Sequence, residues 1–592
     1  MNQHISRRNF MTVSAIATAG ICTSGCSTTI KPARCTANGN GRQLPIYAPT
    51  VKHNDIYFYH PGAKPVLKYN HDVDIVKFKG RFFATWNANQ SRGEDVPGQF
   101  NFLSVSDDFE HWSIPVRMFT RDANAENPVE TDNQWQPDFI NYHDKILFCA
   151  WCDYNARKTY IATSTDGLKW SNREVPTAPK SLSGQVVGFP TNHGLLTSKD
   201  VMMFPCSLPI VEQKCIVGHT QYAGVIFSTD GGKAWQWSEP IEALPWSKIG
   251  EKPEEFGGEL VTLWEPMLFE QADGKIGLLI RNSTAQDNPE RMEKPHRMLL
   301  YSTSSDHGRT WTKARTVELD TICSRNFAVS GVNSPDSLLM VMNDNNVRIP
   351  DRISHDRYFL SLYCTPTCDP DLLLPGPVIQ PQGGTAYYPN GFIDNDKLYV
   401  AYTFAGGMHS SVIEPLPDFS SPFLLPRGGR PGLVIDNSIA RFGQRQTSLG
   451  LVLTEELIKS TRIFLSFDVN INRYNGGDWP ILTLGGKTRQ GTTLRAFYDE
   501  TRKTDLFQVN AGSNRWVEIA PFKMKEWNHV ELEITRDDFN VRINKSNPQF
   551  FKKQLLRKIC FGGLYVAPEW PMGMSRASDV RLKLDTITVK GE

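Results

Sequence analysis

Short apolar or alternating runs of strand length recur along the first 425 residues of the chain. Each run is bounded by polar or turn residues, which is typical of β-strands. The six clearest runs are 75–87, 145–153, 201–206, 276–281, 338–343 and 397–403. They repeat at intervals of roughly 60 residues, enough for four strands and a long loop. The pattern therefore predicts six four-stranded units.

The last third of the chain carries a second set of strand patterns. Segments 463–469, 530–534 and 539–543 alternate apolar and polar residues, and no helical period accompanies them. The Pro- and Gly-rich stretch 426–432 marks a boundary. This pattern predicts an antiparallel β-sandwich and resembles the laminin-G and concanavalin-like lectin group. The expected fold class is all-β: a leader at 1–35, a six-bladed β-propeller at 45–425 and a lectin-like, jelly-roll sandwich at 432–592.

A short motif recurs within the first set of strands. STDGGKAW at 228–235 returns as SSDHGRTW at 304–311, as the shorter STDGLKW at 164–170 and, in degenerate form, as SDDFEHW at 106–112. In such an Asp-box, the Ser and Asp side chains satisfy backbone donors of a tight turn, Gly takes a positive φ, and Trp packs the turn against its sheet. These residues are predicted to hold turns and to perform no chemistry.

The charge balance excludes one class of partner. The chain has 64 Lys and Arg residues against 63 Asp and Glu residues, a net charge of +1, so no overall field attracts nucleic acid or an anionic membrane. Aromatic residues make up 11% of the chain and provide rings that can stack on sugars. We expect a glycan partner and no nucleic-acid partner.

The first 35 residues have the features of an export signal. A twin arginine in SRRNF at 6–10 precedes a mild apolar stretch at 13–21, which is typical of a twin-arginine leader. That stretch is shorter than the roughly 20 apolar residues that a membrane-spanning helix needs. TSGC at 23–26 resembles a lipoprotein cleavage site with Cys26 as the lipidated residue; the alternative is simple cleavage nearby. The mature protein is expected in the periplasm, on the outer membrane as a lipoprotein, or outside the cell.

The 11 cysteines form no dense disulfide framework. Cys149 and Cys152 have CxxC spacing, but strand alternation points them to opposite faces, which favours two buried, apolar thiols. The candidate disulfides of an exported protein are Cys206 with Cys215, and Cys364 with Cys368. Acidic residues occur in no calcium-loop spacing and histidines in no zinc spacing. No metal or cofactor is predicted.

Asp-boxes on a six-bladed propeller behind an export signal resemble the sialidase superfamily, over residues 50–420. The resemblance implies a catalytic Glu and an Arg in a middle blade, here Glu265 and Arg281, and a further substrate-binding Arg, here Arg325. It also implies a nucleophilic Tyr in the last blade, where both Tyr387 and Tyr388 stand. Tyrosine is a known exception to the usual pair of carboxylates; it suits a substrate with an anomeric carboxylate, which would repel a carboxylate nucleophile, and Glu265 would take its proton. Alternatively, Tyr388 is a buried aromatic bonded to backbone and Glu265 only a salt-bridge partner of Arg281.

The first blade departs from the sialidase pattern. Where sialidases carry an Arg-Ile-Pro motif, this chain reads NHDVDIV at 70–76. The arginine that would complete a three-arginine clamp on a carboxylate is missing, so strict sialic-acid specificity is not expected. The following loop offers Glu94 or Asp95, beside Arg92, as the proton donor. A later charged loop is expected at the surface, although one of its arginines could replace the missing one: Arg348, Asp351, Arg352 and Arg357.

Polar residues near the inner strands of several blades indicate a remodelled pocket. Their placement repeats from blade to blade, as expected of substrate-binding side chains near a propeller axis: His71, Asp72, Gln136, Asp138 and His193. His71 could serve as a general acid or base because histidine titrates near neutrality. It could equally be a structural or solvated histidine, and the same holds for His193.

Three hypotheses for function follow. The first is an exported, sialidase-like glycoside hydrolase that removes terminal, acidic sugars from complex glycans or polysaccharides. The second is a polysaccharide lyase on the same scaffold, in which a His or Tyr abstracts the proton beside a uronate carboxylate. The third is a surface glycan-binding lipoprotein without activity.

Overall fold

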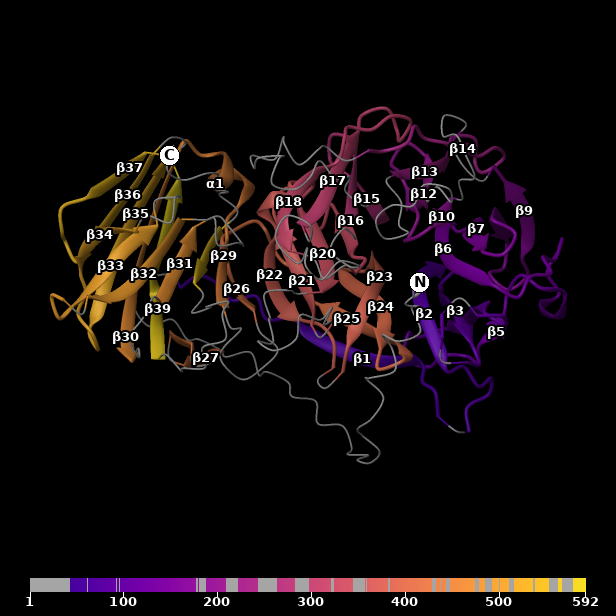
Figure 1. Ribbon diagram of the computed structural model, residues 1–592, viewed down its shortest axis with the longest axis horizontal. Helices are drawn as coiled ribbons and strands as arrows, with labels where there is room; N and C mark the ends of the chain where they lie inside the picture. Colours follow the sequence, from indigo (N-terminus) through magenta and orange to yellow (C-terminus); the bar gives the residue numbers. More distant parts are fainter. Residues whose placement is uncertain are drawn as a thin grey trace, which may run out of the picture.

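The computed structural model describes residues 43–591 with gaps. The gaps are 61, 92, 95, 177–178, 180–187, 209–221, 243–262, 283–297, 321–323, 344–356, 358, 382–383, 428–432, 437, 443–447, 474–478, 485–491, 500, 511–515, 536–537, 553–562 and 567–578. Figure 1 shows a propeller on the right beside a sandwich on the left. Among the described residues, no helix has the length and apolar character needed to cross a bilayer.

Six antiparallel sheets form the blades of the propeller, as predicted. The first strands of neighbouring blades contact one another and so surround the axis. The first two blades are β2 (Tyr69–Phe78), β3 (Arg81–Asn89), β4 (Phe100–Ser106) and β5 (Val116–Arg117), then β6 (Gln134–Tyr142), β7 (Ile146–Asp153), β8 (Lys158–Ser164) and β9 (Ser171–Val175). The third blade has a divided inner strand, β10 (Phe189–Pro190) and β11 (Leu195–Leu196), against β12 (Met202–Leu208), β13 (Tyr222–Ser228) and β14 (Gln236–Trp237). The fourth and fifth are β15 (Leu263–Glu270), β16 (Ile276–Asn282), β17 (Met298–Ser304) and β18 (Arg315–Asp320), then β19 (Phe327–Ser330), β20 (Leu338–Asn343), β21 (Leu360–Thr365) and β22 (Leu374–Val378).

The sixth blade is completed by the N-terminal strand. Its sheet order is β1-β25-β24-β23, with β1 (Thr50–Tyr57), β25 (Gly407–Glu414), β24 (Lys397–Phe404) and β23 (Ala386–Asp394). Pairing of β1 with β25 joins the start of the propeller to its end. The ring is therefore closed by hydrogen bonds between the first and last strands of the propeller.

The apolar runs seen in the sequence are mainly the second strands of the blades. Five of the six runs coincide with β7, β12, β16, β20 and β24 to within two residues. The remaining run, 75–87, is wrong as one strand because it joins the end of β2 to most of β3. Lys79 and Gly80 have φ values of 49° and 79° and make the tight turn between them.

The Asp-boxes hold the turns between the third and fourth strands of the first four blades. In the third blade, Ser228 Oγ donates to Asp230 Oδ1 at 2.8 Å and accepts from the Gly232 amide at 2.9 Å. Asp230 also accepts from the Ala234 amide at 3.0 Å, and Trp235 is buried. These turns lie at the end opposite to the starts of the inner strands, so the Asp-boxes are structural, as predicted.

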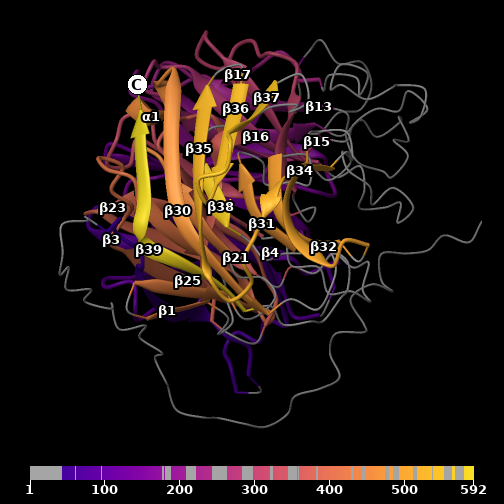
Figure 2. The same cartoon turned by 90° about the vertical axis from the view of Figure 1, so that its left-hand side faces the viewer.

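Two seven-stranded antiparallel sheets follow the propeller. One has the order β26 (Phe423–Arg427), β29 (Ser448–Val452), β38 (Gly563–Val566), β31 (Trp479–Leu484), β32 (Thr492–Asp499), β33 (Thr504–Asn510) and β34 (Trp516–Pro521). The other has β27 (Leu433–Asp436), β28 (Ile439–Phe442), β39 (Asp579–Gly591), β30 (Arg462–Arg473), β35 (Trp527–Thr535), β36 (Asp538–Ile543) and β37 (Gln549–Lys552). Figure 2 shows β39, β30 and β35 running side by side. The short helix α1 (Glu455–Lys459) escaped the sequence pattern because five residues are too few to show a period.

The propeller and the sandwich meet through a shared apolar core. Residues 423–425, which the sequence places in the first unit, lie in β26 and pair with β29. Leu425 and Val452 belong to the same buried cluster as Leu374 of the fifth blade and Tyr47. Because the cluster crosses the junction, the two units pack as one body.

No disulfide is formed among the cysteines that the structure describes. Cys149 and Cys152 are fully buried in separate clusters on the two faces of β7. The predicted Cys364–Cys368 disulfide is wrong: Cys364 is buried in the fifth-blade core, whereas the Cys368 thiol faces the Ser337 carbonyl. Cys206 is a free, buried thiol, and Cys215 lies outside the described residues.

Candidate active site

Four inner strands share a one-residue bulge near their start. In β2, β6, β15 and β23, two residues oppose one on the neighbouring strand. The first of these two residues has a left-handed backbone in every case: Asp72 (φ 56°), Gln136 (45°), Glu265 (45°) and Tyr388 (59°). Such a conformation costs a non-glycine residue on the order of 1–3 kcal/mol, so the surrounding sheet must hold it. Bulges re-aim side chains, and here they bring polar groups together at one end of the propeller.

Arg281 bridges Glu265 and Tyr388. Its Nη1 donates to Tyr388 Oη at 2.7 Å and forms an ion pair with Glu265 Oε2. Arg281 lies one residue before the end of β16, opposite Trp264, the residue before Glu265, so sheet register brings the two charges together. Their side chains are each 2% exposed. The Tyr388 hydroxyl is thus bonded to side chains of this group.

The buried charges fix the protonation of this group. Burial opposes ionisation of Glu265, but Arg281, Arg325 and the hydrogen bond with Tyr388 lower its pKa below the ordinary value. Burial raises the pKa of Tyr388, against the attraction of Arg281 for the phenolate. At neutral pH, these shifts leave Glu265 as a carboxylate and Tyr388 as a neutral phenol.

His71 stacks on Tyr388. The ring centroids lie 4.2 Å apart at 23°, and Tyr387 meets the edge of His71 at 5.5 Å. Burial, with the positive charges of Arg357 and Arg325 adding to it, lowers the pKa of His71 well below its usual value. The imidazole is neutral and adds no charge beside Tyr388.

Asp72, His71 and Glu94 form the second half of the site. One side-chain nitrogen or oxygen from each lies within 4.8 Å of those of the other two. Burial raises the pKa of Asp72 well above its usual value; Arg325 opposes this, and the charge of Glu94 adds to it. A cation site uses the same atom types, but Arg325 Nη1 lies 3.7 Å from Asp72 Oδ1, and its charge would repel a bound cation. The group of His71, Asp72 and Glu94 is therefore better suited to holding a proton than a metal cation. Asp95 and Arg92 lie outside the described residues.

Arg357 brings a third positive charge to the site. Its Cζ lies 5.0 Å from the ring centre of Tyr387 and 4.9 Å from that of Tyr388. The expectation that its loop lies at the surface is wrong for Arg357, which is half-buried. It precedes the third strand of its blade, a position that no sequence motif marks. Arg348, Asp351 and Arg352 lie outside the described residues.

Deeper polar residues connect alternate blades near the axis. Arg325 donates to the Thr191 carbonyl at 2.8 Å and to the Val73 carbonyl at 3.0 Å. His193 Nδ1 lies 2.8 Å from Asp74 Oδ1, which links the third blade to the first. Arg325 and His193 therefore hold the centre of the ring, and their contact with a substrate stays a prediction.

Two further predicted contacts are buried in the second blade. Gln136 is at its bulge, and Asp138 is fully buried beyond it. Burial, and next the charge of Asp74, raise the pKa of Asp138 well above its usual value. Sequence reasoning missed Asp74, because an isolated Asp in a strand carries no sign of such a partner.

Family comparison covers most of the propeller. The BNR repeat-like domain matches residues 80–396, more than half of the chain. The chain belongs to the BNR repeat-like family. With the six-bladed fold, this membership confirms the predicted resemblance to Asp-box propellers of the sialidase type.

Solved structures similar to this BNR-repeat protein include sialidases. Trypanosoma rangeli sialidase in complex with 2,3-difluorosialic acid as a covalent intermediate is 12% identical, with a TM-score of 0.48 over 92% of this chain and 96% of that one. The same sialidase in complex with the inhibitor DANA is 13% identical, with a TM-score of 0.49 over 92% of this chain and 97% of that one. A protein of unknown function from Dyadobacter fermentans is 14% identical, with a TM-score of 0.45 over 62% of this chain and 99% of that one. No curated protein matches the sequence.

Proposed function

We propose that this BNR-repeat protein is an exported glycoside hydrolase that removes terminal sugars bearing an acidic group from glycans. The observation that carries the proposal is the Glu265–Arg281–Tyr388 contact at the converging ends of the blades. A neutral phenol, an adjacent carboxylate and a fixed positive charge are the parts needed for attack by a tyrosine nucleophile.

In the first step, Tyr388 Oη attacks the anomeric carbon while its proton passes to Glu265. Arg281, already 2.7 Å from Tyr388 Oη, stabilises negative charge as it develops on that oxygen. The bond to the leaving oxygen breaks as Glu94 donates a proton to it. Burial raises the pKa of Asp72, so Asp72 holds a proton at neutral pH. One of its oxygens lies within 4.8 Å of a Glu94 oxygen, so this proton can pass to Glu94.

In the second step, water replaces Tyr388 at the anomeric carbon. Glu94, now a carboxylate, takes a proton from this water, and Glu265 returns its proton to Tyr388. Arg281 and Arg357 attract the acidic group of the sugar. The first-blade stretch 70–76, which includes His71, contains no arginine, so we propose acidic sugars as a class rather than sialic acid alone.

The two tyrosines provide the sharpest test. We expect Tyr388→Phe and Glu265→Gln to reduce release of sugars from a glycan pool by roughly a thousandfold, as loss of a nucleophile or its base does. Tyr387→Phe, the matched control, is expected to retain most activity. Equal turnover by the native chain and Glu265→Gln would contradict a catalytic role and favour a glycan-binding protein.

A lyase is the second candidate, supported by the neutral His71 stacked on Tyr388. A neutral imidazole beside a phenol could abstract the proton next to a uronate carboxylate while the arginines neutralise that carboxylate. Such a reaction leaves a double bond in the product. Ultraviolet absorbance of the released sugars separates the two reactions: the hydrolase adds water and produces no new absorbance.

A further inference from the structure

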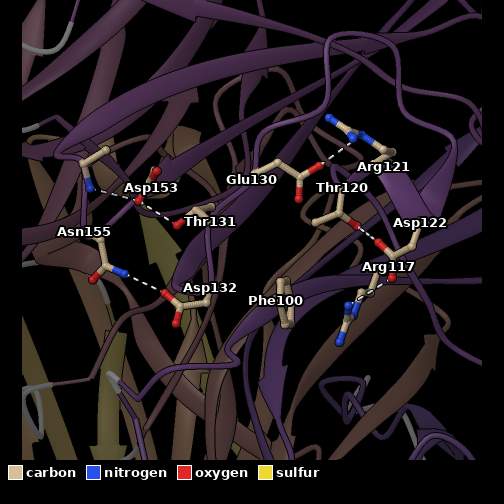
Figure 3. Close-up of a pocket in the computed structure, with 11 residues that line it drawn as sticks. Phe100, Arg117, Thr120, Arg121, Asp122, Glu130, Thr131, Asp132, Asp153 and Asn155 are labelled. Atoms are coloured by element: carbon tan, nitrogen blue, oxygen red, sulfur yellow. Dashed lines mark hydrogen bonds and ion pairs between the residues drawn. The ribbon is translucent and has the colours of Figure 1, made fainter.

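A hollow lies between the first and second blades. Its volume is about 1130 Å³, and its walls come from the start of β4, the end of β7 and the connection from β5 to β6. Glu94 precedes β4, so the hollow opens at the same end of the propeller as the proposed catalytic group. Figure 3 shows two groups of paired side chains on either side of Phe100.

The polar walls of the hollow are ordered by internal pairs. Asn155 Nδ2 donates to Asp132 Oδ1 at 2.8 Å, and Arg117 Nη1 donates to Asp122 Oδ2 at 3.0 Å. Arg117 also lies over the Phe100 ring, with Cζ 3.8 Å from its centre. The buried Asp153 accepts from Thr131 Oγ1 at 2.9 Å. Groups held in this way can bind hydroxyl groups without first being ordered.

The charges of the hollow distinguish it from the catalytic group. Its lining includes four acidic residues and two basic ones: Asp122, Glu130, Asp132 and Asp153 with Arg117 and Arg121. Three arginines gather around the two tyrosines, whereas this excess of acids disfavours sulfated or uronic sugars. The volume of the hollow, about 1130 Å³, exceeds the roughly 300–1,000 Å³ that is usual for small-molecule pockets, which suits several linked sugars.

Asp132 connects the hollow to the loop that carries Glu94. The Asp132 carbonyl accepts from the Gly98 amide at 2.7 Å and from the Gln99 amide at 3.0 Å, while its carboxylate faces the hollow. A proton donor lies on the leaving-group side of the bond it breaks. The hollow, directly behind this loop, is therefore placed where the remainder of a glycan would extend.

We propose that the hollow binds the leaving-group part of the substrate, as an uncharged, hydroxyl-rich oligosaccharide. Its assignment to the leaving group rests on the proposed hydrolase function and on Glu94 as proton donor. The enzyme would then remove acidic terminal sugars from longer neutral chains and would use short substrates poorly.

The test measures binding apart from catalysis. The full chain carrying Tyr388→Phe is applied to immobilised neutral and uronic-acid-containing oligosaccharides, from disaccharides to hexasaccharides. We expect retention on the longer neutral chains, weakened roughly tenfold by Asp132→Asn, which removes one carboxylate partner but keeps the backbone carbonyl. Asn155→Trp, which fills the hollow, is expected to abolish it. Lys158→Trp, on the same blade but outside the hollow, is the matched control, and circular dichroism checks that each variant folds.

The two proposals fail separately. No retention of neutral chains, stronger retention of acidic ones, or retention unchanged by Asn155→Trp overturns the binding site, even if the native chain releases sugars. Retention that Asn155→Trp abolishes, with no turnover by the native chain, supports a neutral-glycan site and overturns the hydrolase.

Discussion

The arginines at the centre of the propeller differ in how deeply they are buried and in how many bonds they make to the fold. Arg325 is fully buried and bonded to carbonyls of two other blades, so its guanidinium is largely committed to the fold. Arg357 is half-buried and lies against both tyrosines. Of these two arginines, Arg357 is the better placed to bind the acidic group of an incoming sugar.

Replacing Arg357 is expected to weaken substrate binding more than chemistry. Because its guanidinium lies over the rings of Tyr387 and Tyr388, Arg357→Ala should raise KM for acidic substrates about tenfold and change kcat little. Arg315→Ala, on the outer strand of the fourth blade, is the control. Steady-state kinetics with acidic and neutral substrates would contradict this if KM rose equally for both.

Among the elements, second strands were predictable from sequence and inner strands were not. β7 and β20 are continuous, buried and apolar, so their pattern has no interruption. The inner strands β15 and β23 are broken by bulges at Glu265 and Tyr388, and bulges carry no composition signal of their own. The family motif located Glu265, Arg281 and the tyrosine pair. Only the folded chain separates Tyr388 from Tyr387, because the choice depends on which hydroxyl reaches Arg281.

The Asp-box turns should contribute to stability without affecting chemistry. Asp230→Ala removes an acceptor that holds the Ser228 hydroxyl and the Ala234 amide, so we expect the free energy of unfolding to fall by about 1–2 kcal/mol. Denaturant titration measures this loss, with the exposed Asp107→Ala as control. A large loss of turnover in folded Asp230→Ala would show that the turn does more than hold its blade.

For the whole molecule, closure of the ring depends on β1 and on an ion pair at its edge. Asp55 of β1 lies 2.7 Å from His409 of β25. The hydrogen bond with His409 lowers the pKa of Asp55. Burial of Asp55 partly opposes this shift, and the positive charge of His409 adds to it. A carboxyl group whose pKa is lowered by folding stabilises the fold at pH values above its ordinary pKa of 3.8. This contribution disappears as the pH falls through the folded-state pKa.

Asp55→Asn is therefore expected to matter near neutrality and not in strong acid. The native chain should unfold at higher denaturant concentration than the variant at about pH 6, with the difference shrinking towards about pH 3 as Asp55 becomes protonated. Parallel denaturant titrations across this range check the prediction. A difference that is constant with pH would mean that the pair does not hold the closing strand.

Closure by the N-terminal strand also has a consequence for timing during synthesis. Asn54 of β1 contacts Ser410, 356 residues later in the chain. At the usual 5–20 residues per second, β1 leaves the ribosome roughly 20–70 seconds before its partner strand exists. Until then its backbone groups have no β25 with which to pair, and the ring cannot close. The newly made chain must therefore be protected from aggregation through this edge until the sixth blade is complete.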